Sequence, residues 1–215
     1  MNLPLTREHL FSIGLNTIKK ALNHIKDIKV ENTKNYFLPD LNKELKSNVD
    51  SELHDIIVSN LKVTSIPIIS EESNNENIDF MNNKGDIWII DPLDGTFNFI
   101  KNLPFSTISI ALYSGHIPIY SFIGVIPSLK LGFISKDGKA VFDDKIINVS
   151  NVNKKDKSVL GTGIPSRQII NAEEKEIFIN NFESFSKIRM LGSASYSLLQ
   201  LAKGSIDSYY EREIM

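Results

Sequence analysis

The chain contains the stretch WIIDPLDGTFNF at residues 88–99, and this stretch decides its fold. It begins as an apolar, β-branched run and reaches a carboxylate at Asp91, which Pro92 holds in an extended conformation because a residue before proline avoids the α region. A second carboxylate follows at Asp94. Gly95 then permits a tight turn, and Thr96 is a favourable N-cap for a short helix. The pattern predicts a strand that ends in two carboxylates beside the free amides of a helix start.

This combination indicates a particular chemistry. Neighbouring carboxylates repel each other unless protons or a cation lie between them, whereas the amides of a helix start attract an anion such as phosphate. A site that needs both a cation and an anion is typical of metal-assisted phosphate chemistry. The plainer interpretation is a strand, a turn and a helix cap whose acids are merely solvated. An isolated Asp-x-x-Asp spacing does not distinguish a metal site from such a solvated turn.

The whole stretch resembles the pattern W-x-I-D-P-x-D-G-T-x-N-F of the inositol monophosphatase family, and every fixed position is met from Trp88 through Phe99. The resemblance implies an α/β fold, a layered helix–sheet sandwich of the inositol monophosphatase and fructose-1,6-bisphosphatase type. It also implies a Mg²⁺-dependent phosphomonoesterase that hydrolyses a small phosphorylated alcohol by means of a metal-activated water. The implied Mg²⁺ ligands are Glu71, Asp91, Asp94 and the backbone carbonyl of Leu93.

The same resemblance assigns further roles. Thr96, paired with Asp50, would orient the attacking water, and Glu71 would act in catalysis as well as in metal binding. The residues implied to face the phosphate and the leaving alcohol are Asp94, Gly95, Thr96, Gly192, Ser193, Ala194 and Glu211. From the residues alone, Asp50 could be only a helix N-cap, and the pair Glu71-Glu72 could be only a solvated turn.

The chain departs from the family pattern in three places. Ser47 stands where the family has Thr, three residues before Asp50. Ser70 stands where the family has Gly, and related 3′(2′),5′-bisphosphate nucleotidases often have Ser there, so that activity is an alternative. The chain ends at Met215, before the family's Trp-Asp pair, whose Asp completes the metal cluster. We therefore expect a fold that is incomplete at the C-terminus, poor phosphatase activity and marginal stability; a truncated, non-catalytic remnant is the alternative of another class.

Composition sets broader bounds. A length of 215 residues fits one domain or two small ones, and a polar stretch after residue 150 predicts an N-terminal α+β subdomain with the metal site at 1–150 and a partial α/β subdomain at 151–215. The net charge of −2 gives no case for nucleic acid as a main partner. The absence of cysteine excludes disulfides and thiolate metal sites. With no signal peptide and no membrane span in the sequence, we expect a cytoplasmic protein, and the family leaves a homodimer open.

Apolar spacing predicts the main elements. A helix opens near Thr6, an antiparallel meander follows residue 105, and Asn171 with Glu174 forms a capping box for a later helix. The last helix should stop at Gly204. The side chains expected to be buried by these helices are Phe11, Leu15, Ile18, Leu22 and Ile25 in the first, Phe178, Phe182 and Phe185 in the later one, and Leu198, Leu201 and Ala202 in the last.

Overall fold

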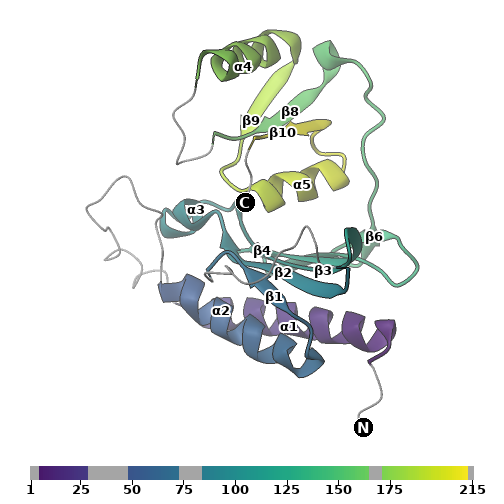
Figure 1. Ribbon diagram of the computed structural model, residues 1–215. Helices are drawn as coiled ribbons and strands as arrows, with labels where there is room; N and C mark the ends of the chain where they lie inside the picture. Colours follow the sequence, from purple (N-terminus) through teal and green to yellow (C-terminus); the bar gives the residue numbers. More distant parts are fainter. Residues whose placement is uncertain (1–4, 29–47, 73–83, 165–170, 213–215) are drawn as a thin grey trace.

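The computed structural model describes residues 5–28, 48–72, 84–164 and 171–212, and these fold into alternating layers of helices and sheets (Figure 1). Among these residues there are two sheets, one of seven strands and one of three. The arrangement confirms the predicted α/β fold with layered helices and sheets.

The larger sheet consists of β1 (Ile68–Ser70), β2 (Asp86–Asp94), β3 (Ser106–Ser114), β4 (Ile117–Ile126), β5 (Lys130–Ile134), β6 (Ala140–Phe142) and β7 (Lys145–Ile146). Its spatial order follows the chain order. β1 and β2 run parallel, and each later pair is antiparallel. The predicted meander is therefore confirmed, and the parallel pair brings the carboxyl ends of β1 and β2 to the same edge.

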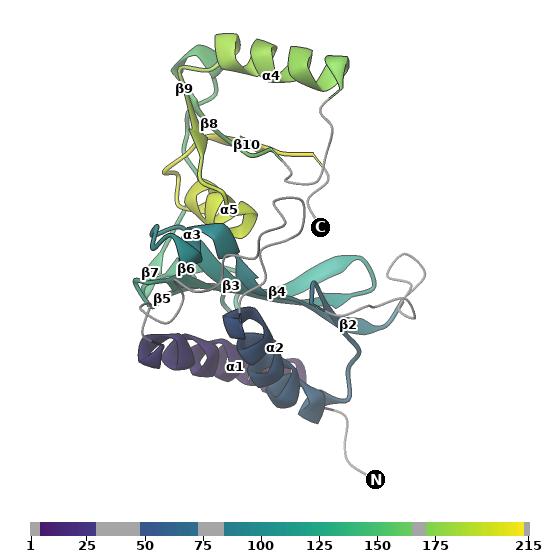
Figure 2. The same ribbon diagram turned by 90° about the vertical axis from the view of Figure 1, so that its left-hand side faces the viewer.

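Helices cover both faces of this sheet. α1 (Arg7–Asp27) and α2 (Asn48–Leu61) pack against each other on one face, whereas α5 (Ala194–Ala202) lies on the opposite face beside the short α3 (Thr96–Ile100) (Figures 1 and 2). None of the helices in the described residues combines the length and the apolar character needed to cross a membrane.

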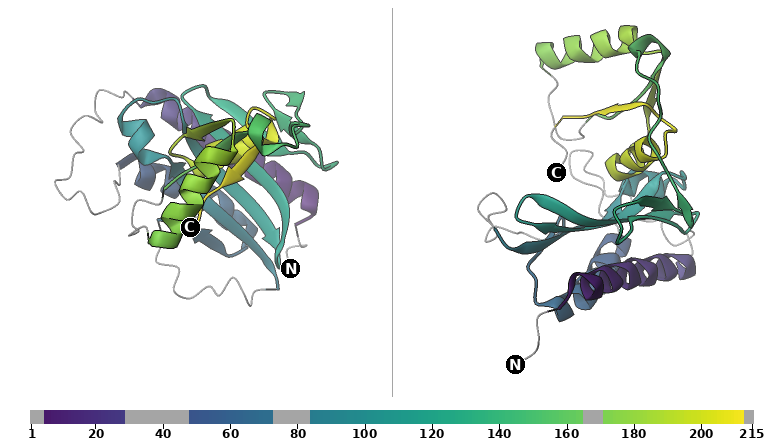
Figure 3. Two further views of the ribbon diagram at one scale, coloured as in Figure 1. Left: turned by 90° about the horizontal axis from the view of Figure 1, so that it is seen from above. Right: turned by 90° about the vertical axis from the view of Figure 1, so that its right-hand side faces the viewer.

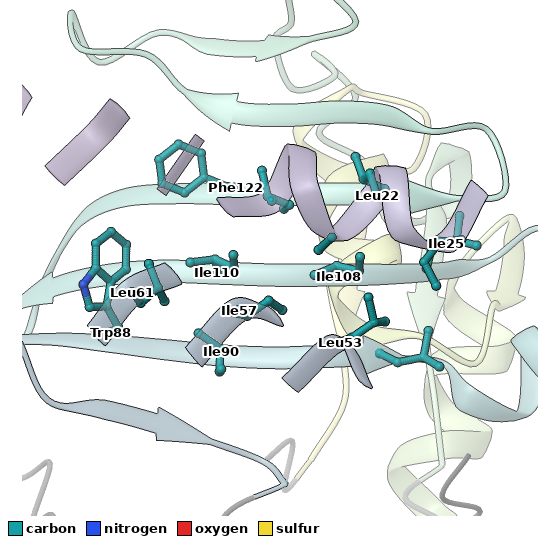
Figure 4. Packing of buried hydrophobic residues seen from close by; sticks show 14 of the residues in the cluster. Leu22, Ile25, Leu53, Ile57, Leu61, Trp88, Ile90, Ile108, Ile110 and Phe122 are labelled. Atoms are coloured by element: carbon teal, nitrogen blue, oxygen red, sulfur yellow. The ribbon is translucent and has the colours of Figure 1, made fainter. Parts of the chain in front are cut away.

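The main core lies between α1, α2 and the sheet. As predicted, α1 begins after Thr6, whose hydroxyl accepts a hydrogen bond from the amide of His9. Trp88 is fully buried and donates its indole N–H to the Thr64 hydroxyl at 3.2 Å. Each fully buried aliphatic side chain contributes roughly 1.5–3 kcal/mol. Figure 4 shows this layer, which includes Leu22, Ile25, Leu53, Ile57, Leu61, Ile90, Ile108, Ile110 and Phe122.

The smaller sheet is parallel, with β8 (Val159–Thr162) between β10 (Ser208–Tyr210) and β9 (Lys187–Met190). Beyond it lies α4 (Ala172–Ser184), at the far end of the molecule from α1 (Figure 3). α4 begins with the predicted capping box. α5 lies between the two sheets and contacts β2, β3 and β4 of the larger one as well as β8 and β10 of the smaller one.

Two predictions about buried helix faces were wrong. No residue of α4 is buried, and Phe182 is 66% exposed, whereas Phe178 lines a cavity of about 250 Å³ together with Ile188 of β9. In α5 the buried apolar residue is Leu199, whereas Leu198 is 45% exposed. The predicted stop at Gly204 is confirmed, since this glycine has a φ of 68° just after the helix.

Candidate active site

The carboxyl end of β2 carries Asp91 and Asp94. Asp91 pairs with Ser109 of β3 and Asp94 with Thr107, so three residue steps on β2 oppose two on β3. In a regular strand, residues three apart point to opposite faces. The irregular pairing, which includes Pro92 with its missing N–H, brings the two carboxylates close enough for the charge on Asp94 to act on Asp91.

A third carboxylate meets this pair from β1. Glu71 follows β1, donates its amide to the Ile90 carbonyl, and shares a side-chain hydrogen bond with Asp91. Burial raises the pKa of Asp91 well above its ordinary value, and the charges on Asp94 and Glu71 raise it further. Burial also raises the pKa of Glu71, although the hydrogen bond to Asp91 opposes that rise. Negative charge is thus concentrated at this strand edge.

The donor set suits a hard divalent cation. Carboxylate and carbonyl oxygens are the ligands that Mg²⁺ and Ca²⁺ prefer, and a cation would relieve the mutual repulsion that now leaves Asp91 and Glu71 sharing a hydrogen bond. Within the described ranges, no three acidic or histidine side chains converge closely enough to enclose a metal ion as they stand. By their chemistry, the oxygen donors present fit a hard divalent cation.

Thr96 lies beside this acidic group and contacts the residue predicted to be its partner. Its hydroxyl is 3.0 Å from Asp50 Oδ1 and 3.0 Å from the Leu93 carbonyl oxygen, and its single proton can go to either. The expectation that Thr96 is an N-cap was wrong, because Gly95 takes that position and Thr96 is the first residue of α3. Asp50 is likewise the third residue of α2 rather than its cap, and Ser47 lies outside the described residues.

Gly95 is closely surrounded. Its φ is 80°, and an added Cβ would lie 3.1 Å from the Gly192 carbonyl oxygen, from the Phe105 carbonyl oxygen and from Ser193 Cβ. Asn98 holds the same neighbours in place, since its side-chain amide donates to the carbonyls of Phe105, Leu191 and Gly192. The start of α3 and the loop before α5 are therefore fixed against each other.

The second element of the site is the beginning of α5. Ser193 caps this helix by accepting the amide of Tyr196, and it donates its hydroxyl to Asp94 Oδ2 at 2.8 Å. The amide and the hydroxyl of Ser195 reach the same oxygen, at 2.7 and 2.6 Å. Sequence reasoning singled out Ser193 but missed Ser195, because α5 also carries Ser197 and Gln200 and its local pattern does not single out Ser195.

Glu211 lies at the end of β10, beside Tyr209. It follows β10, and one of its carboxylate oxygens accepts the Tyr209 hydroxyl. Burial raises the pKa of the Tyr209 hydroxyl, and the charges of Glu211 and Asp94 add to the rise. An added Cβ at Gly163 would lie 2.2 Å from the Glu211 carboxylate, so this glycine leaves the room that the side chain occupies. Tyr209 was also missed from the sequence.

The signature strand, the acidic group and the α5 start can now be compared with known proteins. A model of the inositol monophosphatase family matches residues 6–215. The chain belongs to the inositol monophosphatase family. The predicted resemblance is thereby confirmed, and the match reaches well beyond the short pattern at residues 88–99.

Curated family members are about 30% identical to this chain over the aligned residues. Inositol monophosphatase 1 of Solanum lycopersicum is 32% identical over 174 residues, which cover 78% of this chain and 63% of that protein. Nus factor SuhB of Vibrio cholerae is 30% identical over 207 residues, which cover 94% of this chain and 76% of that protein. The chain therefore spans less than two thirds of the tomato relative's length.

A solved structure agrees with the fold. The extragenic suppressor protein suhB from Bartonella henselae superposes with a TM-score of 0.79 at 24% sequence identity, over 96% of this chain and 79% of that one. A likeness at this identity shows the fold alone. Family membership and fold are thus established.

Proposed function

We propose that the chain is part of a Mg²⁺-dependent phosphomonoesterase that hydrolyses a small phosphorylated alcohol. The observation that carries this proposal is the contact of the Thr96 hydroxyl with Asp50 Oδ1, directly beside the acidic group formed by Glu71, Asp91 and Asp94. A hydroxyl fixed by a buried carboxylate, next to clustered negative charge, suits the handling of a water molecule at a metal site. Family membership supports the reaction class.

In this proposal Mg²⁺ is held by the carboxylates of Glu71, Asp91 and Asp94 and by the carbonyl oxygen of Leu93. When bound, the ion would stabilise the charge on the phosphate and lower the pKa of a coordinated water below its bulk value of about 15.7. Asp91 occupies the centre of the group, because both Glu71 and Asp94 act on it. Its loss should therefore affect metal binding more than the loss of any peripheral acid.

Thr96 and Asp50 act on the water. When Thr96 donates its proton to Asp50 Oδ1, its oxygen keeps lone pairs that accept a hydrogen bond from a water. Asp50 is 4% exposed and cannot itself reach far into the site, so it acts through Thr96. The pair thereby orients a water lone pair towards the phosphorus. Thr96, which accepts the hydrogen bond from this water, is the group positioned to take its proton.

The phosphate and the alcohol would occupy the space between β2 and α5. The amides of Gly95 and Thr96 would hold phosphate oxygens, and the turn from Gly192 through Ala194 would face the leaving alcohol. Glu211 would accept hydrogen bonds from the hydroxyl groups of that alcohol. Tyr209 restricts the orientation of the Glu211 carboxylate by donating to it.

The residue that raised the nucleotidase alternative has a structural role. Ser70 is buried, accepts the amide of Glu72 and lies 2.9 Å from His54 Nδ1. Its hydroxyl serves the turn that carries Glu71 and Glu72, so it provides no argument for a nucleotide substrate. The proposal therefore keeps a phosphorylated alcohol as the first substrate class.

The test is phosphate release by the purified chain from inositol 1-phosphate and from adenosine 3′,5′-bisphosphate, each with Mg²⁺ and with EDTA. We expect EDTA-sensitive release from the first substrate, and we expect Asp91→Asn to abolish both this release and Mg²⁺ binding in calorimetry. Asp144→Asn, which removes a charge from an exposed turn, is the matched control and should leave both unchanged. Undiminished Mg²⁺ affinity in Asp91→Asn would reject the assignment of the metal site.

A further inference from the structure

One oxygen of Asp94 accepts an unusual number of hydrogen bonds. Oδ2 receives the hydroxyl of Ser193, the amide of Ser195 and the hydroxyl of Ser195, all within 2.8 Å. Each carboxylate oxygen offers about two lone-pair sites, so Oδ2 is fully occupied. Among the described residues, every hydrogen bond to the Asp94 side chain goes to this oxygen, and Oδ1 is left for another partner.

The direction of the hydrogen bonds extends this arrangement to β3. Thr107 lies opposite Asp94 on β3, is fully buried, and has its hydroxyl 2.5 Å from the hydroxyl of Ser195. Ser195 has one hydroxyl proton, and an ionised carboxylate can only accept. Ser195 therefore donates to Asp94, and its oxygen accepts the proton of Thr107. The chain of donors runs from Thr107 through Ser195 to Asp94.

The consequence is a carboxylate with a fixed rotamer. Three donors from α5 restrain Oδ2, and Thr107 restrains the orientation of the Ser195 hydroxyl, so Oδ1 is held in one direction. Asp91 differs, because the backbone hydrogen bond to its carboxylate comes from the Leu93 amide alone. A metal ligand that is oriented before binding loses less conformational entropy when the ion arrives.

We propose that Ser195 and Thr107 are a positioning pair that holds Asp94 ready to bind the divalent cation through Oδ1. This proposal rests on the proposed function, since it takes Asp94 as a Mg²⁺ ligand. In this role neither hydroxyl is a ligand of the metal or of the substrate. The two hydroxyls act on the metal only by orienting Asp94. Because Ser195 belongs to α5, whose start would face the leaving alcohol, a shift of α5 would also move a metal ligand.

The primary test is calorimetric measurement of Mg²⁺ affinity for Ser195→Ala and for Thr107→Val, without substrate. Substitutions of groups that orient metal ligands typically weaken binding 10–100-fold. We expect about tenfold for Ser195→Ala, because the Ser195 amide and the Ser193 hydroxyl still reach Oδ2, and a smaller, several-fold loss for Thr107→Val. The matched control is Ser197→Ala on the same helix, which removes a buried hydroxyl bonded to the Ser193 carbonyl and should leave Mg²⁺ affinity unchanged.

A double-mutant cycle separates the donor chain from two independent effects. If Thr107 acts only through Ser195, adding Thr107→Val to Ser195→Ala should cause no further loss of affinity. Melting in EDTA checks that each variant is folded. A Ser195→Ala protein that binds Mg²⁺ within twofold of the unmodified chain would overturn the positioning pair alone. An unmodified chain that binds no Mg²⁺ would overturn this proposal together with the proposed function.

Discussion

Gly95→Ala is the substitution whose cost can be worked most directly from the structure. Gly95 has a φ of 80°, where an L-residue with a Cβ costs roughly 1–2 kcal/mol. The new Cβ would also lie 3.1 Å from two backbone carbonyl oxygens and one side-chain carbon. Backbone atoms cannot rotate away, and overpacking of this kind typically costs another 1–3 kcal/mol. We expect a total destabilisation of about 2–5 kcal/mol.

Gly138 provides the matched control for this substitution. Its φ is 79°, but no atom lies within 4 Å of an added Cβ, so Gly138→Ala has the conformational cost without the crowding. For a chain of this length, 1 kcal/mol shifts the melting temperature by roughly 2–4 °C. Thermal unfolding should therefore show a loss of a few degrees for Gly138→Ala and about 4–20 °C for Gly95→Ala. Equal losses in the two variants would refute the close approach of α3 and the α5 loop.

Two further predictions concern the hydroxyl of Thr96 and the carboxylate of Asp207, which lies just before β10. Thr96→Ala should lower turnover about a hundredfold at saturating Mg²⁺, with little change in calorimetric Mg²⁺ affinity, because a hydroxyl that orients water acts mainly in the transition state. The control variant Thr96→Ser should keep most of the turnover. A loss of Mg²⁺ affinity in Thr96→Ala would instead show that the residue is structural. Asp207 accepts hydrogen bonds from the Ser150 hydroxyl and the Val159 amide, which hold its pKa below the ordinary value of about 3.9. The ionised Asp207 carboxylate therefore stabilises the fold at pH values above its ordinary pKa, and this stabilisation is lost as pH falls through its folded-state pKa. Melting temperatures measured from pH 6 to pH 3 should fall less steeply for Asp207→Asn than for the unmodified chain. Parallel curves for the two proteins would contradict this prediction.

The fold was largely predictable because its signals are local. The apolar spacing of α1, the alternation along β3 and β4, and the capping box at Asn171 each depend on residues within a few positions of one another. The stretch at residues 88–99 carried the family resemblance, which the match over residues 6–215 confirmed. The pairing of Thr96 with Asp50 also followed from the resemblance, and the structure places these side chains in contact.

The parts that were missed depend on long-range contacts. Ser195 and Thr107 are 88 residues apart, and no local pattern says that their hydroxyls meet at Asp94. Leu199, not Leu198, is the buried residue because Asp94 binds the first turn of α5 and so sets which side of the helix faces the sheet. Phe182 remains exposed because burial of an apolar side chain needs a surface opposite it, which periodicity cannot supply.

The irregular pairing at the end of β2 makes the spacing between its two acids intolerant of insertion and deletion. A chain with one residue fewer between Asp91 and Asp94 could restore a regular ladder with β3, yet it would also remove or displace the Leu93 carbonyl that accepts the Thr96 hydroxyl. Random mutagenesis selected only for thermal stability should accept such length variants here. Selection for activity should reject them, so the lengths recovered under the two regimes would separate what this strand needs to fold from what it needs to work.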